Sequence, residues 1–459
     1  MPALAALQLL GQGCSSTGGD DGVAGTGSDS APPEVTDSGG GTGGTDVRAE
    51  PTVLPVLWID VGGQSIPEDT KIGGWLRVIE DHDGTLGDIP ASPASMEVPI
   101  GVEYRGQWSL QFPKKSYSIE LRDAAGEDVD LPFLGLPAES DWVLRAGYFD
   151  RTLLRDALAF WLFSDVWGRY ASRFRFVEVY VDGGYEGVFL ACEKVKRSRH
   201  RVDLPAVAPD AEQGDLTGGY LVHIESNSGG EGFETSSGRV WEYGYPPAAA
   251  VTPDQNAYLT DYFDRFERAM DADDFSDPTR GYAQWLDLAS AVDFALFQEL
   301  ARNTDGYTKS SYYQKVSDAE GGKLRTAPIW DNDLSFGNFA NGTETPEGWL
   351  YEFDWNRPVP WWGRLWVDSG FRSAASCRWQ ELRAGPLTVA AIGTKLDELA
   401  AVLAQAQPRE NARWNLIGRE EERSAHVGET WEDDVAYLER WLALRIEWLD
   451  AELAGGCRR

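Results

Sequence analysis

The sequence predicts an α+β fold in which a strand-rich part with one helix, residues 53–195, precedes a helix-rich part, residues 196–459. Short runs of β-branched and aromatic residues, separated by turn signals, fill the first part. Apolar residues at helical spacing, preceded by capping residues, dominate the second. A chain of 459 residues is long enough for one large two-lobed domain or for two to three domains.

Strand signals in the first part begin near residue 53. The single-strand runs are residues 53–61, 75–79, 96–104, 112–121 and 141–145. A helix is then predicted from Leu153 to Leu162, with Asp150 as a plausible N-cap. A hairpin follows, because residues 176–181 and 185–191 are joined by the strong turn signal Asp182-Gly183-Gly184.

Helix starts mark the second part, after one more strand at residues 218–225. Thr252-Pro253-Asp254-Gln255 is a capping box with proline at the first helical position. Asp287 caps a second helix, and a last long helix begins at Thr430. The apolar stripes of these helices are interpreted as core.

Two acidic segments carry the chemistry that this sequence suggests. Asp305 lies in residues 303–313, and Asp331 and Asp333 lie in residues 329–338. Residues 314–328 between them predict a hairpin, which would bring all three carboxylates to one end of a small sheet. Like charges raise one another's pKa, and a hard divalent cation removes that penalty. A Mg²⁺ or Mn²⁺ site is therefore predicted, with one aspartate free to act as a base.

Several readings of the charged residues stay open at this point. Asp-x-Asp also occurs in metal-dependent glycosyltransferases and in structural turns. Lys115 lies on the apolar face of a strand, so it either reaches a cleft that holds an anion or is solvated at the strand end. Arg145 and Arg155 flank the start of the first helix and are either phosphate ligands or partners in ion pairs.

Composition limits the partners and the chemistry. The formal net charge of −33 argues against a nucleic-acid partner, which requires a basic surface. The four histidines are scattered, so a histidine-based triad or a three-histidine metal site is not expected. The cysteines form no zinc motif. Cys377 and Cys457 are able to pair in an oxidising compartment, although the sequence leaves their pairing open.

The N-terminal region predicts export. Residues 1–14 look like the end of a bacterial lipoprotein signal, with Cys14 as the lipidated residue and a possible membrane tether. Residues 15–52 are rich in Gly, Ser and Thr, so they are expected to form a disordered linker. The predicted location is the cell envelope or the medium, and the oligomeric state is unknown.

The chain resembles the CotH family of atypical secreted protein kinases, the spore-coat-protein-H type. The matching stretches are Arg105-Gly106 with Ser109, residues 112–117, Leu144-Arg145 with Leu154-Arg155, residues 179–189 with Glu193, residues 218–221, residues 303–307, residues 330–333 with Phe336-Gly337, and Trp441, Arg445 and Trp448. They keep a consistent order over roughly residues 55–455.

This resemblance implies a two-lobed kinase-like fold, with a β-rich N-lobe and a helical C-lobe, that transfers phosphate from ATP to Ser or Thr of a protein acceptor. It implies that Asp305 is catalytic, that Asp331 holds the metal and that Asp333 assists. Lys115 would contact the phosphates, with Lys114 as the fallback. Arg105, Arg145, Arg155 and Glu193 complete the implied cofactor-binding set, and Cys192 to Lys194 would be the adenine-contacting linker.

One departure from the family pattern concerns the metal. Many relatives have Asn five residues after the catalytic Asp, where this chain has Ser310, which is a weaker ligand. A catalytically weak or inactive surface scaffold or adhesion protein with a structural cation is therefore the alternative. The Trp-rich segment 349–362 also favours that alternative, and another nucleotide- or sugar-dependent transferase is the remaining one.

Overall fold

The computed structural model describes residues 54–80, 82, 89, 91–224, 231–326, 328–353, 361–421 and 423–458. The predicted signal and linker, including Cys14, lie outside these residues. Within the described residues, no helix is long and apolar enough to cross a membrane. Both strands and helices are present, so the α+β class is confirmed. The kinase-like two-lobed arrangement stays a prediction.

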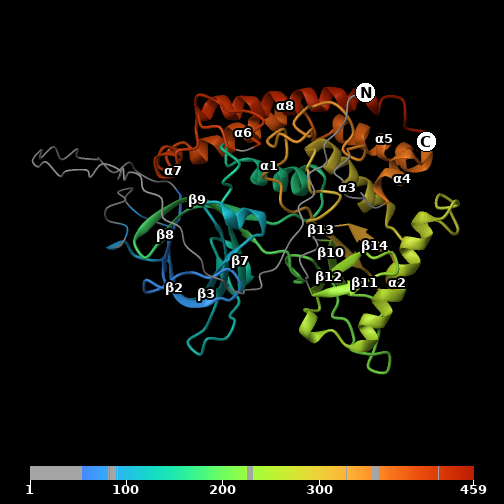
Figure 1. The fold of residues 1–459 in the computed structure, drawn as a ribbon, viewed down its shortest axis with the longest axis horizontal. Coiled ribbons are helices and arrows are strands. Elements are labelled where there is room, and N and C mark those ends of the chain that lie inside the picture. The colour runs from blue at the N-terminus through green and yellow to red at the C-terminus, as the bar shows by residue number, and fades with distance from the viewer. Residues whose placement is uncertain are drawn as a thin grey trace, which may run out of the picture. The chain divides into compact units, whose positions relative to one another are not determined.

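The strand-rich part forms a closed seven-stranded barrel in the order β1-β2-β3-β4-β7-β9-β8 (Figure 1). Its strands are β1 (Val56–Asp60), β2 (Ile72–Ile79), β3 (Met96–Arg105), β4 (Ser116–Leu121), β7 (Asp141–Arg145), β8 (Phe174–Val181) and β9 (Gly184–Glu193). Neighbours are antiparallel except β1 and β8, whose parallel pairing closes the barrel. Single-strand patterns do not show this closure, because it joins segments far apart in the chain. A separate ribbon contains β5 (Leu131–Phe133) and β6 (Leu136–Glu139).

Alternation along the strands separates the inside of the barrel from its outer face. Tyr117, Ile119 and Leu121 of β4 are buried in the barrel core. Ser116 and Ser118 have the opposite parity, so they lie on the outer face. Strand β7 divides in the same way, because Leu144 belongs to the barrel core and Val143 belongs to the large core shared with the helices.

A second sheet, in the order β11-β12-β10-β13-β14, lies in the helix-rich part. Its strands are β10 (Tyr220–Ile224), β11 (Gly232–Glu234), β12 (Val240–Tyr245), β13 (Ser311–Lys315) and β14 (Leu324–Thr326). The predicted hairpin between the acidic segments is confirmed as β13 and β14. The sequence patterns missed β11 and β12.

The helices begin where capping residues predict them. Thr252 forms a capping box at α2 (Pro253–Asp271), Asp287 caps α3 (Leu288–Ala301), and Thr430 caps α8 (Trp431–Glu452). The first helix, α1 (Arg155–Trp161), starts later than predicted and continues as a π-helical turn, η3 (Leu162–Val166). Asp150 still accepts a hydrogen bond from the Arg155 backbone nitrogen at 2.8 Å. The remaining helices are α4 (Trp362–Val367), α5 (Ser369–Ala384), α6 (Val389–Leu403) and α7 (Gln407–Trp414).

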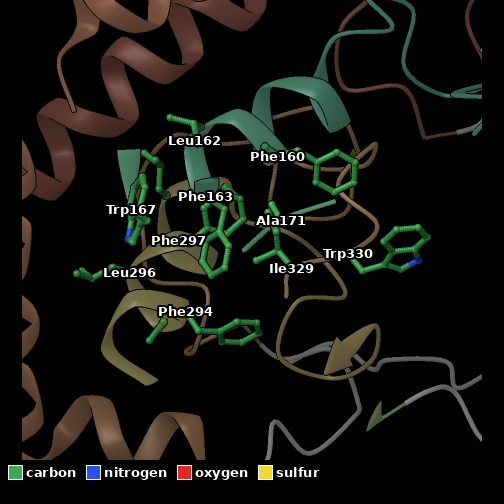
Figure 2. Packing of buried hydrophobic residues seen from close by; sticks show 14 of the residues in the cluster. Phe160, Leu162, Phe163, Trp167, Ala171, Phe294, Leu296, Phe297, Ile329 and Trp330 are labelled. Atoms are coloured by element: carbon green, nitrogen blue, oxygen red, sulfur yellow. The ribbon is translucent and has the colours of Figure 1, made fainter. Parts of the chain in front are cut away.

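One hydrophobic core joins α1, η3 and α3 to the first residues of the second acidic segment. Figure 2 shows Phe163 beside Phe297, whose ring centroids are 5.2 Å apart. Ile329 and Trp330 extend from the same cluster and are buried. The core therefore fixes the chain immediately before Asp331. A disulfide between Cys377 of α5 and Cys457 ties the C-terminal segment to this helical part.

Candidate active site

A cavity of about 600 Å³ lies between the outer face of the barrel and the segments that follow α3. The outer face contributes Ser116, Ser118, Val143 and Arg145. The segments after α3 contribute Asp305, Lys309, Ser310, Tyr312, Trp330, Asp331 and Asp333. Both predicted acidic segments therefore reach one cavity, as the hairpin between them predicts.

Arg145, at the end of β7, is the central cation of this cavity. Its Nε donates to Asp156 Oδ2 at 2.6 Å, and its Nη2 donates to Asp331 Oδ1 at 2.6 Å. The same Nη2 lies 3.6 Å from Asp333 Oδ1. Asp156 belongs to α1, so one guanidinium links the barrel, the helix that follows it and the second acidic segment.

The backbone around Asp331 is held by the same elements. Asp331 has a φ of 63°, in the left-handed region that residues other than glycine rarely adopt. The Asn332 backbone nitrogen donates to Asp156 Oδ1 at 2.9 Å. Asn303 Nδ2 donates to the Asp331 carbonyl at 3.0 Å. These contacts hold the unusual conformation and keep the carboxylate facing the cavity.

The three carboxylates near Arg145 titrate differently. Burial alone would raise the pKa of Asp331, but the Arg145 charge lowers it below its ordinary value. Burial and then the charges of Asp331 and Asp156 raise the pKa of Asp333 well above its ordinary value. Burial also raises the pKa of Asp156, against the effect of Arg145. Asp333 is therefore the carboxylate that holds a proton most readily.

Asp305 lies on a tight loop after α3. Asn303 Oδ1 accepts from its backbone nitrogen at 3.1 Å, and Lys309 Nζ lies 3.0 Å from Asp305 Oδ2. The loop needs glycine at position 306, because a Cβ there would meet the Gln298 side chain at 1.9 Å. Ser310 Oγ lies 3.4 Å from Asp331 Oδ2. The loop thus connects the two acidic segments through Ser310.

Three residues of the predicted cofactor-binding set, Lys115, Arg155 and Glu193, are paired with other residues and lie outside the cavity lining. Lys115 donates to the Leu110 carbonyl at 2.6 Å and pairs with Glu68, outside the cavity lining. Arg155 pairs with Asp150 at 2.6 Å, in the interior. Glu193 is fully buried and pairs with Arg173. The expectation that Lys115 reaches a cleft is wrong. Lys115 has the parity of the residues that point into the barrel, and its amino group contacts Leu110 and Glu68 instead of the cavity.

Lys114, the fallback lysine, is a different case. Its side chain is 0% exposed and its Nζ lies 2.6 Å from Glu410 Oε1 of α7. It also donates to the Val188 carbonyl at 2.6 Å. Lys114 lines part of the cavity wall, but its charge is already neutralised. Arg105 lines the cavity too, and its buried Nη1 has no hydrogen-bond partner among the described residues.

Several lining residues were not predicted from the sequence. Asp156, Lys309, Tyr312 and His223 all contact or line the site. His223 of β10 is paired across the sheet with Tyr312 of β13, with ring centroids 5.0 Å apart. Burial lowers the pKa of His223 to about 4, so its imidazole is neutral. The sequence could have placed His223 beside Tyr312 only through the pairing of β10 with β13, and the pattern of each strand taken alone does not specify its partner.

The protein side chains of this site fit a metal ion only if a bound molecule, such as one with phosphate groups, supplies further oxygen atoms. Arg145 and Lys309 lie among the three carboxylates, so their mutual repulsion is already partly offset by protein cations. Within the described residues, no group of three or more His, Cys, Asp or Glu side chains is arranged to hold a metal ion. Asp331 and Asp333 still offer two neighbouring carboxylates. Mg²⁺ is commonly held by one or two carboxylates together with phosphate oxygens and water, so this donor set fits.

A comparison with models of known protein families shows to which family the chain belongs. The model of the CotH kinase protein family matches residues 102–449. This chain belongs to the CotH kinase family. The CotH match includes β4, β7, α1, both acidic segments and most of α8, so it covers the whole cavity. Membership in a kinase family implies use of ATP and action on protein substrates. Among curated proteins, the search gave no match.

Proposed function

We propose that this CotH protein transfers the γ-phosphoryl group of ATP to a Ser or Thr hydroxyl of a protein acceptor. The observation that carries the proposal is the bridge from Asp156 through Arg145 to Asp331, beside Asp305, in a single cavity. Protein kinases use a comparable lysine–glutamate pair between a strand and the following helix to position the phosphates. Here the pair is an arginine and an aspartate, on β7 and α1.

The nucleotide phosphates are placed against Arg145 and Arg105. Both guanidiniums stack on Trp330, at 5.0 Å and 5.4 Å from its ring centroid. Stacking keeps the planar groups oriented, which suits bidentate contacts to phosphate oxygens. The unpaired Nη1 of Arg105 supports an anionic ligand, because a buried donor without a partner is costly.

The nucleobase is placed between Val143 of the barrel and the Tyr312–His223 pair of the second sheet. Lys194 also lines the cavity. An aliphatic wall facing an aromatic pair suits a flat, neutral ring. This placement keeps the predicted linker role for Lys194, while Cys192 and Glu193 are buried.

A magnesium ion carried by the nucleotide would be held by Asp331 and Asp333, with the Ser310 hydroxyl nearby. When bound, it neutralises charge on the phosphate oxygens. Arg145 then keeps its contact with Asp156 and turns its second nitrogen toward the phosphates. The lowered pKa of Asp331 supports this role, because an ionised carboxylate is the form that binds a cation.

Asp305 orients the acceptor hydroxyl and accepts its proton as the phosphoryl group is transferred. The Lys309 contact holds Asp305 in place until the acceptor arrives. Phosphoryl transfer depends mainly on positioning and charge stabilisation, so a fixed carboxylate is sufficient. Lys309 is also placed to neutralise the transferred phosphate.

The test is transfer from labelled ATP with Mg²⁺ or Mn²⁺ to the chain itself and to a generic protein acceptor. Wild type is expected to incorporate label, and Asp305→Asn and Asp331→Asn are expected to lose it. Asp261→Asn is the matched control, because Asp261 is exposed on α2 and its ion pair within the described part of the chain is the surface pair with Arg265. Equal labelling in wild type and in Asp331→Asn would reject the assigned site.

A catalytically weak or inactive scaffold is the second candidate. The observation in its favour is that Asp305 and Asp331 are already paired with Lys309 and Arg145. The Trp-rich segment gives it no support, since the described tryptophans Trp349, Trp361 and Trp362 are buried rather than presented to a partner. Binding of ATP without any transfer, in wild type, would favour this candidate.

Export with a lipid tether at Cys14 is also part of the proposal. The disulfide between Cys377 and Cys457 supports it, because disulfides persist in oxidising compartments. The test is cell fractionation of the full chain with Cys14→Ser, which is expected to move the protein from the membrane fraction to the soluble exported fraction. An unchanged distribution would reject the tether.

A further inference from the structure

Five aromatic side chains form a continuous ledge at the cavity: Trp108, Phe112, Tyr148, Phe149 and Phe339. Trp108 stacks on Phe149 with ring centroids 4.7 Å apart and meets Phe112 edge-on at 4.8 Å. Phe339 contacts Trp108 at 5.7 Å, and Tyr148 stacks on Phe112 at 5.5 Å. All of these except Phe339 line the cavity.

Trp108 is the most exposed ring of the ledge. Trp108 is 42% exposed although three rings contact it. It sits on the short turn η2 (Trp108–Gln111), in which no residue is buried. Gly106 before this turn has a φ of 125°, and a Cβ there would meet Ser109 Oγ at 2.0 Å. The turn therefore has a fixed conformation that presents an apolar ring to solvent inside the cavity.

The ledge is also tied to the reacting groups. Asn338 Nδ2 donates to the Phe149 carbonyl at 3.0 Å and to the Asp333 carbonyl at 2.7 Å. Arg105, at the base of the same turn, lines the phosphate region. A ligand on the ledge would therefore lie close to the proposed metal carboxylates.

Position along the chain, in β7 and the residues that follow it, separates the ledge from the proposed base site. Val143 and the Tyr312–His223 pair all line the cavity; Arg145 is two residues after Val143 in the chain, and Tyr148 and Phe149 follow. Side chains two residues apart on a strand share a face and are about 6.6 Å apart. With the base at Val143 and the phosphates at Arg145, as proposed above, the ledge follows the phosphates and lies at the end where the acceptor would enter.

We propose that the ledge binds an apolar side chain, aromatic or large aliphatic, that neighbours the acceptor Ser or Thr in a polypeptide. The proposal rests on the proposed function. Its occupant follows from chemistry, because the five side chains carry no charge and the base has a site at the other end. Aromatic anchors in preformed pockets supply much of the affinity of protein interfaces. Selection among acceptor polypeptides would thus depend on Trp108 rather than on the acidic residues of the cavity.

The experiment uses two sets of Ser peptides, one with Phe or Leu and one with Gly or Asn at each position within three residues of the Ser. Phosphate transfer is measured for each peptide, and peptide binding is measured by fluorescence anisotropy. Wild type is expected to prefer the apolar set by about tenfold in kcat/KM. Trp108→Ala is expected to remove that preference while leaving the KM for ATP unchanged. Trp75→Ala is the matched control, because Trp75 is 57% exposed on β2 and lies outside the cavity.

The outcomes separate the two proposals. If wild type transfers phosphate without an apolar preference, or if Trp108→Ala leaves the preference intact, the ledge proposal is overturned and the kinase proposal stands. If Trp108→Ala instead raises the KM for ATP, the ledge is a base platform and the proposal is also overturned. If apolar peptides bind through Trp108 but receive no phosphate, the ledge stands as a binding site and the kinase proposal falls.

Discussion

Arg145 and Arg155 lie ten residues apart in the sequence and look alike in it, but they occupy opposite environments. Each guanidinium pairs with a carboxylate at 2.6 Å. Arg155 and Asp150 are sealed in the interior, with 3% and 2% of their side chains exposed. Arg145 is 10% exposed and reaches Asp331, which is 42% exposed. The sealed pair supports the fold, whereas the open pair has a partner that a ligand is able to replace.

The difference shows that a buried ion pair becomes a functional candidate only when one of its partners faces a cavity. Arg155 also donates to the Ser335 carbonyl at 3.1 Å, so its hydrogen-bond partners among the described residues all belong to the protein interior. Arg145 divides its donors between Asp156, which is buried, and Asp331, which is accessible. Removing each residue should therefore affect a different property.

The largest expected effect is on catalysis at the open pair. Arg145→Lys keeps the charge but loses the planar fork that contacts Asp156 and Asp331 together. We expect phosphate transfer to fall about a thousandfold, about 4 kcal/mol in transition-state stabilisation. The measurement is kcat/KM with labelled ATP. A loss of less than threefold would show that Arg145 is only a structural partner.

The next effect is on stability at the sealed pair. Arg155→Met leaves Asp150 buried without its partner, which should lower the free energy of unfolding by about 3–5 kcal/mol. Urea unfolding followed by fluorescence measures this change. Protein that still folds should keep most of its transfer activity per folded molecule. If Arg155→Met lowers activity as strongly as Arg145→Lys without loss of stability, the contrast between the two arginines fails.

A third effect concerns pH and the wall of the open cavity. The pKa of His223 is about 4 in the folded protein, below its ordinary value of 6.5. The unfolded state therefore binds a proton first as pH falls, and stability is lost from about pH 6.5 down to about pH 4. Between pH 7.5 and 5.5 wild type should lose about 1–2 kcal/mol more than His223→Gln. If the free energies of unfolding of the two proteins, measured by urea unfolding, fall equally between pH 7.5 and 5.5, His223 is not the origin of the acid sensitivity.

The smallest effect separates stability from function within the open site. Asp333 has a raised pKa, so its ionisation disfavours the folded state as pH rises above the unfolded value. Asp333→Asn should stabilise the ligand-free protein by about 1 kcal/mol at pH 7.5, and the gain should vanish near pH 3.5. The same variant should weaken Mg²⁺-dependent ATP binding. Thermal unfolding and calorimetry measure the two changes, and destabilisation at pH 7.5 would contradict the account.

Local patterns predicted the elements of this fold well. Turn residues at Asp182-Gly183-Gly184 and caps at Thr252, Asp287 and Thr430 act within a few residues, so the sequence shows them directly. The hairpin between the acidic segments was predicted for the same reason. Barrel closure was not, because β1 and β8 pair across a large sequence separation.

The site was predicted only in part, for a related reason. Asp305, Asp331 and Asp333 were expected to lie together because one hairpin connects them, and all three line one cavity, with Ser310 beside them; their roles stay predictions. Which of the predicted lysine and arginine side chains line the cavity could be decided only from the tertiary structure. Lys115 has the strand parity of the barrel interior, and Arg155 turns into the protein, so only Arg105 and Arg145 of the predicted arginines line the cavity. The role of Asp156 depends on how α1 packs, which no motif specified.

The most direct test of the central claim is a crystal structure with a non-hydrolysable ATP analogue and Mn²⁺, examined by anomalous scattering. The account predicts a manganese peak between Asp331 and Asp333, phosphates against Arg145, and the base beside Val143 and Tyr312. Nucleotide bound away from Arg145 would contradict it, as would the absence of a manganese peak at these carboxylates when the analogue occupies the cavity.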